Sequence, residues 1–227
     1  MNGNARFILN DCIFFDLGWT LEDESKAQIF RAEGAAVAAA EFGTTTTSSR
    51  ILELQDEGAG VFAPSVFRYA LRRIGLDEEN ANIVERKATW DKSRLLLYPD
   101  SKSVLEHFRG RCYLGLLANQ SPGTESRLRA YEIIDYFDLI LASAELGLAK
   151  PDPAIFEYAL KQSGCDPAKT WMVGDRIDND IRPANIAGWH TIRILNGYNE
   201  KQQPRDDLEV PDYTVDTLGE IIEIIPT

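Results

Sequence analysis

Short apolar runs that end abruptly in polar residues recur along the chain. The first covers residues 13–15 and ends at Asp16, and later runs cover 112–117 and 170–173. Runs of this length and composition predict buried parallel strands. Because the carboxyl ends of parallel strands meet at one edge of a sheet, we expect the polar residues that follow these runs to lie close together.

Strand and helix patterns alternate from residue 98 to the end of the chain. Further strands are expected at 139–142, 191–194 and 213–215, and helices at 104–109, 124–133, 154–163, 181–187 and 218–225. This alternation predicts an α/β fold with a doubly wound parallel sheet and right-handed crossovers. Residues 1–10 are expected to form a loose lead-in. The charged, proline-containing stretch 199–211 is expected to form a surface loop.

The stretch 22–97 is helical in pattern and contains no strand signal. Spaced apolar residues predict helices at 27–42, 49–54, 66–74 and 81–90, with Thr47 or Ser48 as the cap of the second. Pro99 breaks the last of these helices and marks the return to alternation. We therefore expect an α/β core domain made of residues 1–21 and 98–227, and an inserted helical domain made of residues 22–97.

Composition and charge narrow the possible partners. A formal net charge of −12 disfavours binding to nucleic acid and to anionic membranes. No apolar segment is long enough to span a bilayer, and the amino terminus has no signal-peptide pattern. The three cysteines are odd in number and have no metal-type spacing, which predicts buried reduced thiols. Together these features predict a cytoplasmic protein.

Several charged residues follow the predicted strands, and each has two interpretations. Asp16 either caps the next turn or is a functional carboxylate that needs a compensating cation. A lysine before a proline, such as Lys150, is typical of a solvated loop. Asp175, Asp178 and Asp180 fit the acidic first turn of a helix. Gathered at one sheet edge, the carboxylates instead fit a site for a hard cation such as Mg²⁺, which prefers oxygen ligands.

Four motifs decide between these interpretations. They occur in the order FFDLGWT at 14–20, LGLLAN at 114–119, LAKPDP at 148–153 and VGDRIDND at 173–180. In this order they resemble the motifs of the haloacid dehalogenase-like (HAD) hydrolase superfamily, and they span nearly the whole chain. The resemblance implies a Rossmann-like core in which the helical stretch after the first strand is a cap domain.

The resemblance also implies a reaction, the hydrolysis of a small phosphorylated metabolite. Asp16 would be the nucleophile that forms an aspartyl-phosphate, and Lys150 would stabilise charge on the phosphoryl oxygens. Ala118 and Asn119, together with Lys150, would bind the substrate.

A Mg²⁺ ion would complete the site that the resemblance implies. Its ligands would be Asp16, the backbone carbonyl of Gly18, Asp175 and, directly or through water, Asp180. Asp178 is assigned to the acidic helical turn instead. Arg176 either meets the substrate phosphate or pairs with a neighbour.

The chain departs from the family pattern at two positions. Family phosphatases usually carry an aspartate as general acid and base where this chain has Gly18, and a serine or threonine where it has Ala118. Loss of the acid typically costs 10² to 10⁴ in rate, whereas loss of one neutral hydrogen bond costs about 1 kcal/mol.

These departures permit three outcomes. In the first, the protein is a working phosphatase in which water, Glu22 or Asp23 replaces the acid. In the second, a phosphoenzyme forms but turns over slowly or passes its phosphate to an acceptor, and in the third the protein binds phosphometabolites without catalysis. A metal-independent dehalogenase also lacks the second aspartate, but the run from Gly174 to Asp180 argues against it. Four arginines of the helical stretch are either phosphate-facing or solvated: Arg50, Arg68, Arg72 and Arg73.

Overall fold

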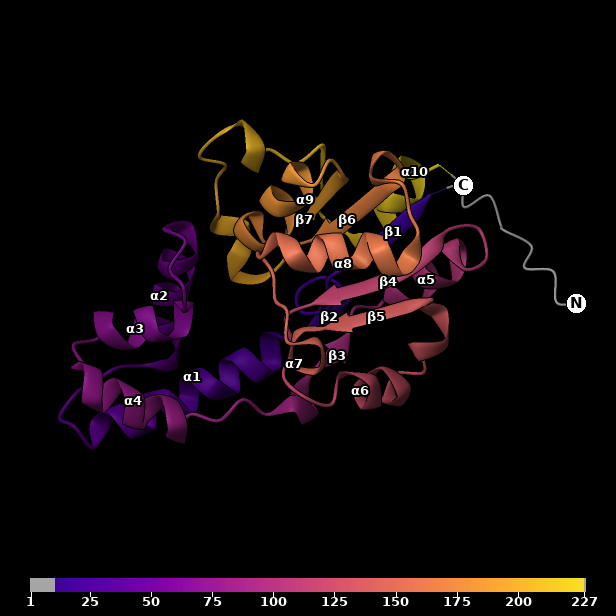
Figure 1. The fold of residues 1–227 in the computed structure, drawn as a ribbon. Helices are drawn as coiled ribbons and strands as arrows, with labels where there is room; N and C mark the ends of the chain where they lie inside the picture. The colour runs from indigo at the N-terminus through magenta and orange to yellow at the C-terminus, as the bar shows by residue number, and fades with distance from the viewer. Residues whose placement is uncertain (1–10, 227) are drawn as a thin grey trace, which may run out of the picture. The chain divides into compact units, whose positions relative to one another are not determined.

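The computed structural model describes residues 11–226 and contains a six-stranded parallel sheet (Figure 1). In spatial order its strands are β5 (Leu139–Ala142), β4 (Tyr113–Ala118), β1 (Cys12–Phe15), β6 (Thr170–Gly174), β7 (His190–Ile194) and β8 (Tyr213–Val215). Every neighbouring pair is parallel, which confirms the predicted α/β sheet. The expected lead-in at 1–10 lies outside the described residues.

The strand order places the ends of β1, β4 and β6 side by side. In the register of the sheet, Phe15 of β1 is opposite Leu116 of β4 and Val173 of β6. The chain leaves β1 for β4 and β5 on one side, then returns to β6, β7 and β8 on the other. This reversal is the point where open α/β sheets form their binding sites.

Side chains of β1 alternate between two cores, one on each face of the sheet. Ile13 and Phe15 belong to a core that includes Phe108 of α5 (Ser101–Phe108), Leu128 of α6 (Thr124–Ala130) and Ile221 of α10 (Ile221–Ile224). Phe14 belongs to a second core with side chains of α8 (Pro153–Ser163) and α9 (Arg182–Ile186). Helices on both faces make the sheet doubly wound, as predicted.

The described chain divides into two compact units, and the second consists of Asp23–Leu96 and Asn196–Gln203. Its helices are α1 (Ser25–Ala40), α2 (Ser48–Gly60), α3 (Val66–Arg73) and α4 (Glu78–Lys87). The alanine face of α1 packs in a core with Ile51, Leu54 and Leu71. Thr47 caps α2 by accepting a hydrogen bond from the Arg50 N–H, as expected. None of the helices between residues 11 and 226 has the length and apolar character needed to cross a membrane.

Residues 196–203 lie elsewhere than the sequence analysis placed them. They were expected in the core domain, with residues 199–203 at the start of a surface loop, but they form part of the second unit. The reason is the short helix η5 (Gly197–Lys201), which packs on α2 and buries Asn199. A contact with a helix so distant in sequence leaves no periodic signal in the segment itself.

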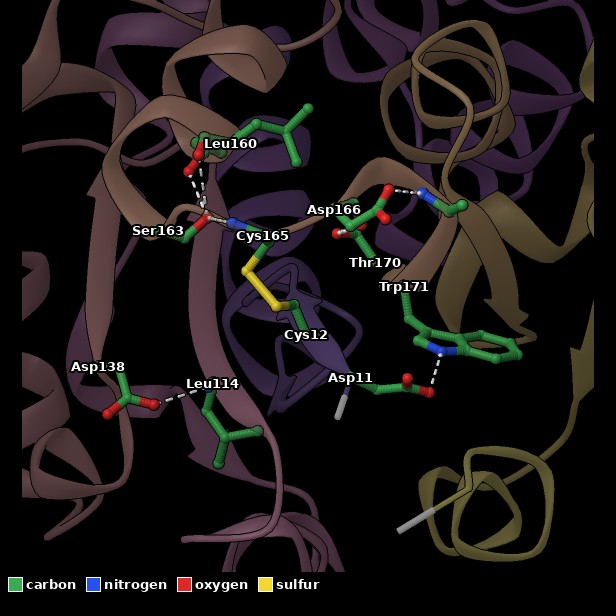
Figure 2. The surroundings of a disulfide bond; sticks show 12 residues. Asp11, Cys12, Leu114, Asp138, Leu160, Ser163, Cys165, Asp166, Thr170 and Trp171 are labelled. Atoms are coloured by element: carbon green, nitrogen blue, oxygen red, sulfur yellow. Dashed lines mark hydrogen bonds between the residues drawn. A yellow bond between two sulfur atoms is a disulfide. The ribbon is translucent and has the colours of Figure 1, made fainter. Parts of the chain in front are cut away.

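A disulfide joins Cys12 and Cys165, so the expectation of reduced thiols is wrong for these two residues (Figure 2). Cys12 begins β1, and Cys165 follows the end of α8, which packs on the same face of the sheet. Their separation of 153 residues hides this proximity in the sequence. The disulfide also removes one ground for expecting a cytoplasmic protein.

The third cysteine, Cys112, is buried and carries a free thiol, as expected. Burial raises the pKa of this thiol to about 11. Because only the thiolate reacts as a nucleophile, Cys112 should be inert near neutral pH.

Thiol titration should therefore report one thiol in unfolded, unreduced protein, none in native protein and three in unfolded protein after reduction.

Reducing the Cys12–Cys165 bond should lower the free energy of unfolding by about 2–5 kcal/mol, because the bond closes a long loop of the unfolded chain. Urea unfolding with and without dithiothreitol measures this change. The double variant Cys12→Ser, Cys165→Ser is the control and should not respond to reductant. Three reactive thiols in unreduced, unfolded protein would contradict the disulfide.

Candidate active site

Backbone hydrogen bonds hold Asp16 at the carboxyl edge of the sheet. Its N–H donates to the Val173 carbonyl at 2.9 Å, which extends the pairing of β1 with β6 by one residue. The chain then turns tightly, and the Leu17 carbonyl accepts hydrogen bonds from the N–H groups of Leu21 and Glu22, both at 2.9 Å. The carboxylate of Asp16 is thus presented where the strand ends.

Three carboxylates meet at this edge of the sheet. Asp16, Asp175 and Asp180 each offer an oxygen, and these oxygens lie within 4.8 Å of one another. Asp175 directly follows β6, and Asp180 lies on the helical turn η4 (Ile177–Ile181). Both are buried, with 2% and 1% of their surface exposed. Closely spaced carboxylate oxygens are the donor set that hard divalent cations prefer, so the residues present fit Mg²⁺.

Gly174 makes room for Asp180. A Cβ at position 174 would lie 2.5 Å from the carboxylate of Asp180. The Arg176 N–H also donates to Asp180 Oδ2 at 3.0 Å. The position of Asp180 therefore depends on a glycine at the end of β6 and on the turn that follows.

Lys150 reaches into the carboxylate cluster. Its Nζ donates to Asp16 Oδ1 at 2.7 Å and also to Asp180 Oδ1. Burial lowers the pKa of Lys150, but the charges of Asp16 and Asp180 outweigh burial and raise it. Burial raises the pKa of Asp180 to about 6; Lys150 opposes this shift and Asp16 adds to it. The ammonium thus offsets part of the negative charge, and like-charge repulsion among the carboxylates remains.

The two predicted substrate-binding residues at the end of β4 differ in what they offer. Ala118 is fully buried and has only backbone groups for hydrogen bonding. The side chain of Asn119 instead bonds the backbone of Lys150: Nδ2 donates to the Lys150 carbonyl at 2.7 Å, and Oδ1 accepts from the Lys150 N–H at 2.8 Å.

Arg176 pairs with a neighbour, which was one of its two expected roles. Its Nη2 donates to Asp178 Oδ2 at 2.6 Å and its Nε donates to Asp178 Oδ1 at 3.1 Å. Asp178 accordingly lies apart from the three-carboxylate cluster.

Glu22, a candidate replacement for the missing acid, is engaged elsewhere. It is fully buried and accepts a hydrogen bond from the Tyr131 hydroxyl at 2.6 Å. The Arg127 Nε lies 3.0 Å from the same oxygen. Both contacts fall on the same oxygen, so the Glu22 carboxylate is held inside the core unit by Tyr131 and Arg127. The other candidate, Asp23, accepts a hydrogen bond from the Ser25 N–H at the start of α1.

The arginines of the helical stretch lie in ion pairs within their own unit. Arg50 pairs with Glu53, Arg68 with Glu78 and Glu85, Arg72 with Glu78, and Arg73 with Glu57. Most of these side chains are substantially exposed, so each pair contributes little to stability.

Arg193, a buried residue beside the cluster, was not among the residues predicted from the sequence. It lies on β7 in register with Gly174, and its Nε is 3.5 Å from the backbone carbonyl of Asp175. The sequence does contain a sign of this residue, because an arginine interrupts the predicted strand 191–194 and a buried charge requires a partner.

The fold and the cluster define a class of protein: a doubly wound α/β protein with an acidic, lysine-containing site at the carboxyl edge of its sheet. A family model described as haloacid dehalogenase-like hydrolase matches residues 11–188, and the chain belongs to this family.

Individual relatives agree with this assignment. The chain is 32% identical over 227 residues to a glyceraldehyde 3-phosphate phosphatase of Methanopyrus kandleri, with 94% of this chain and 96% of the relative covered. It is 34% identical over 172 residues to a phosphoserine phosphatase of Thermus thermophilus, covering 75% and 68%. A crystal structure of a predicted phosphoglycolate phosphatase from Haemophilus somnus shares the fold, with a TM-score of 0.70, 23% identity and coverage of 95% and 98%.

Replacing Gly174 with alanine should disrupt the cluster, because the added methyl group would overlap the Asp180 carboxylate. We expect the free energy of unfolding to fall by about 1–3 kcal/mol, as in other overpacked sites. Urea unfolding measures the change. The matched control is Gly219→Ala, where the nearest atom to an added Cβ lies 3.6 Å away. Equal effects of the two substitutions would show that Gly174 is not needed for the approach of Asp180.

Proposed function

We propose that this protein is a Mg²⁺-dependent phosphatase that acts on a small phosphorylated metabolite through an aspartyl-phosphate on Asp16. The observation that carries the proposal is the convergence of Asp16, Asp175, Asp180 and Lys150 at one sheet edge. Two relatives are named as phosphatases of glyceraldehyde 3-phosphate and phosphoserine, both small phosphomonoesters.

In the proposed reaction an oxygen of Asp16 attacks the phosphorus of the substrate. The bond to the leaving oxygen breaks, and that oxygen takes a proton from water. Lys150, held 2.7 Å from Asp16, places positive charge beside the phosphoryl oxygens as they pass through the transition state. Water then attacks the phosphorus of the aspartyl-phosphate, releases phosphate and restores Asp16.

Mg²⁺ would be held by Asp16, the Gly18 carbonyl, Asp175 and Asp180. Bound there, it would neutralise charge between the carboxylates and the phosphate. Without such a cation, a dianionic phosphate would enter a site that already holds several carboxylates. The same repulsion disfavours the metal-independent dehalogenase alternative, because a haloacid is also an anion.

A second candidate is a phosphometabolite-binding protein that turns over slowly or not at all. It is favoured by the two positions that lack functional side chains, Gly18 and Ala118. The engagement of Glu22 with Arg127 and Tyr131 adds to this possibility, because it removes one substitute acid.

Asp16→Asn should abolish phosphatase activity in the presence of Mg²⁺. Removal of a nucleophile lowers kcat by at least about 10³-fold, and EDTA should likewise abolish the wild-type activity. Release of phosphate from a panel of phosphomonoesters measures both effects. Asp178→Asn is the matched control, since Asp178 pairs with Arg176 outside the cluster, and it should retain most activity. Full activity of Asp16→Asn would remove the nucleophile assignment.

Thermal unfolding of the wild-type protein, measured beside phosphate release, distinguishes the binding protein from the phosphatase. Mg²⁺ together with a phosphometabolite should raise the melting temperature whether or not turnover occurs, because both ligands bind the native state. A raised melting temperature without phosphate release would favour the binding protein.

Hydrolysis should be fastest for substrates with good leaving groups, such as anomeric and acyl phosphates. These leaving oxygens need little protonation, so the absence of an acid at Gly18 matters least for them. The measurement is kcat/KM across phosphates of graded leaving-group pKa. Gly18→Asp should flatten the dependence by supplying an acid. A rate that is independent of leaving-group pKa in the wild type would contradict the prediction.

A further inference from the structure

We propose that Asn119 is a positioning residue for Lys150 and does not act as a ligand of the substrate. This inference rests on the proposed phosphatase function and assigns one of its side chains a different role. It begins from the two hydrogen bonds, 2.7 and 2.8 Å long, between the Asn119 side chain and the backbone of Lys150.

The two bonds form a clamp on a single residue. The amide oxygen of Asn119 accepts from the Lys150 N–H, while the amide nitrogen donates to the Lys150 carbonyl. This is the pairing that a neighbouring strand would provide, but here a side chain provides it. One such bond would leave the Lys150 backbone free to rotate about the bond, whereas two bonds fix both its position and its orientation.

The clamp ties a loop to the sheet. Asn119 directly follows β4, whose last residue, Ala118, pairs with Ala142 of β5. Lys150 lies between α7 (Ser143–Leu146) and α8, in a segment that belongs to neither helix nor strand. Its backbone therefore takes its place in the site from Asn119, across 31 residues of sequence.

Lys150 needs this support because its ammonium is shared by two anions. Nζ bonds both Asp16 and Asp180, and a lysine side chain has many rotamers. If the backbone were free, the ammonium could follow Asp180 and leave Asp16, where the phosphoryl group is transferred. Misplacement of a catalytic group by about 1 Å can cost 10²-fold in rate.

A double-mutant cycle tests the proposal through activity. Asn119→Ala should lower kcat by about 10- to 100-fold with little change in KM, as expected for a misplaced catalytic group. In a Lys150→Met background the same substitution should have less than about a twofold further effect, because the residue it positions is gone. The proposal would be overturned if Asn119→Ala lowered kcat by the same factor in the Lys150→Met background as in the wild type. It would also be overturned if Asn119→Ala raised KM and left kcat unchanged, because Asn119 would then bind the substrate directly.

Matched variants separate the clamp from general damage to the loop. Gln120→Ala is the control, because the Gln120 side chain accepts a hydrogen bond from Arg127 and does not bond Lys150. Its effect should be the same with and without Lys150. Asn119→Asp keeps the acceptor for the Lys150 N–H and loses the donor to its carbonyl, so its kcat should lie between those of wild type and Asn119→Ala.

Chemical labelling tests the clamp without activity. Acetylation by acetic anhydride, followed by mass spectrometry, should modify Lys150 at least about fivefold faster in Asn119→Ala, with exposed Lys161 on α8 as the internal reference. The ratio of the Lys150 to the Lys161 acetylation rate should not change in Gln120→Ala. An unchanged ratio in Asn119→Ala would overturn the clamp even if the wild type is an active phosphatase. An inactive wild type with a raised ratio would instead refute the proposed function and support the clamp.

Discussion

The buried ion cluster of Lys150, Asp16 and Asp180 is the interaction on which the rest of the structure depends. Their side chains are 2%, 13% and 1% exposed, so the charges are largely removed from water. Removing one partner of a buried ion pair typically costs about 3–5 kcal/mol, because the remaining charge is uncompensated. An exposed pair contributes about 0–1 kcal/mol. The cluster therefore requires the end of β1, the turn after β6 and the loop before α8 to be adjacent, and the observed strand order places β1 beside β6.

Close approach within this arrangement is achieved by glycines in the strands. Gly174 admits the Asp180 carboxylate, and a Cβ at Gly115 of β4 would lie 2.3 Å from the ring of Phe14. Both glycines are needed for close approach of a neighbouring side chain and not for an unusual backbone conformation, since neither has a positive φ. The disulfide between Cys12 and Cys165 holds the far ends of the same two elements, β1 and α8. Packing and a covalent bond thus hold β1, which ends at Asp16, and α8, which follows Lys150.

Sequence patterns predicted the parts of the site that follow apolar runs. Asp16 and Asp175 could be placed at one sheet edge because each ends a recognisable strand. The Asn119 contact could not be predicted in this way, because its partners are backbone atoms that every residue possesses. The Cys12–Cys165 pair and the position of residues 196–203 depend on contacts between distant segments, which leave no periodic trace. The sequence shows Arg193 as a charge within an apolar strand, but it does not show that the partner is the backbone carbonyl of Asp175.

In the proposed phosphatase, the glycine at position 18 would change the charge balance of the site as well as its acid chemistry. A carboxylate there would add a negative charge to a loop that already begins with Asp16. Two like charges about 5 Å apart repel by about 3 kcal/mol at an effective dielectric constant of about 20. In the proposed phosphatase, the absence of that carboxylate would remove a general acid, which is worth a rate factor of about 10² to 10⁴, or roughly 3–5 kcal/mol of barrier. The two effects are similar in size and opposite in sign for an anionic phosphate. Which one dominates depends on the leaving group, because only a poor leaving group needs the proton, whereas every phosphate meets the repulsion.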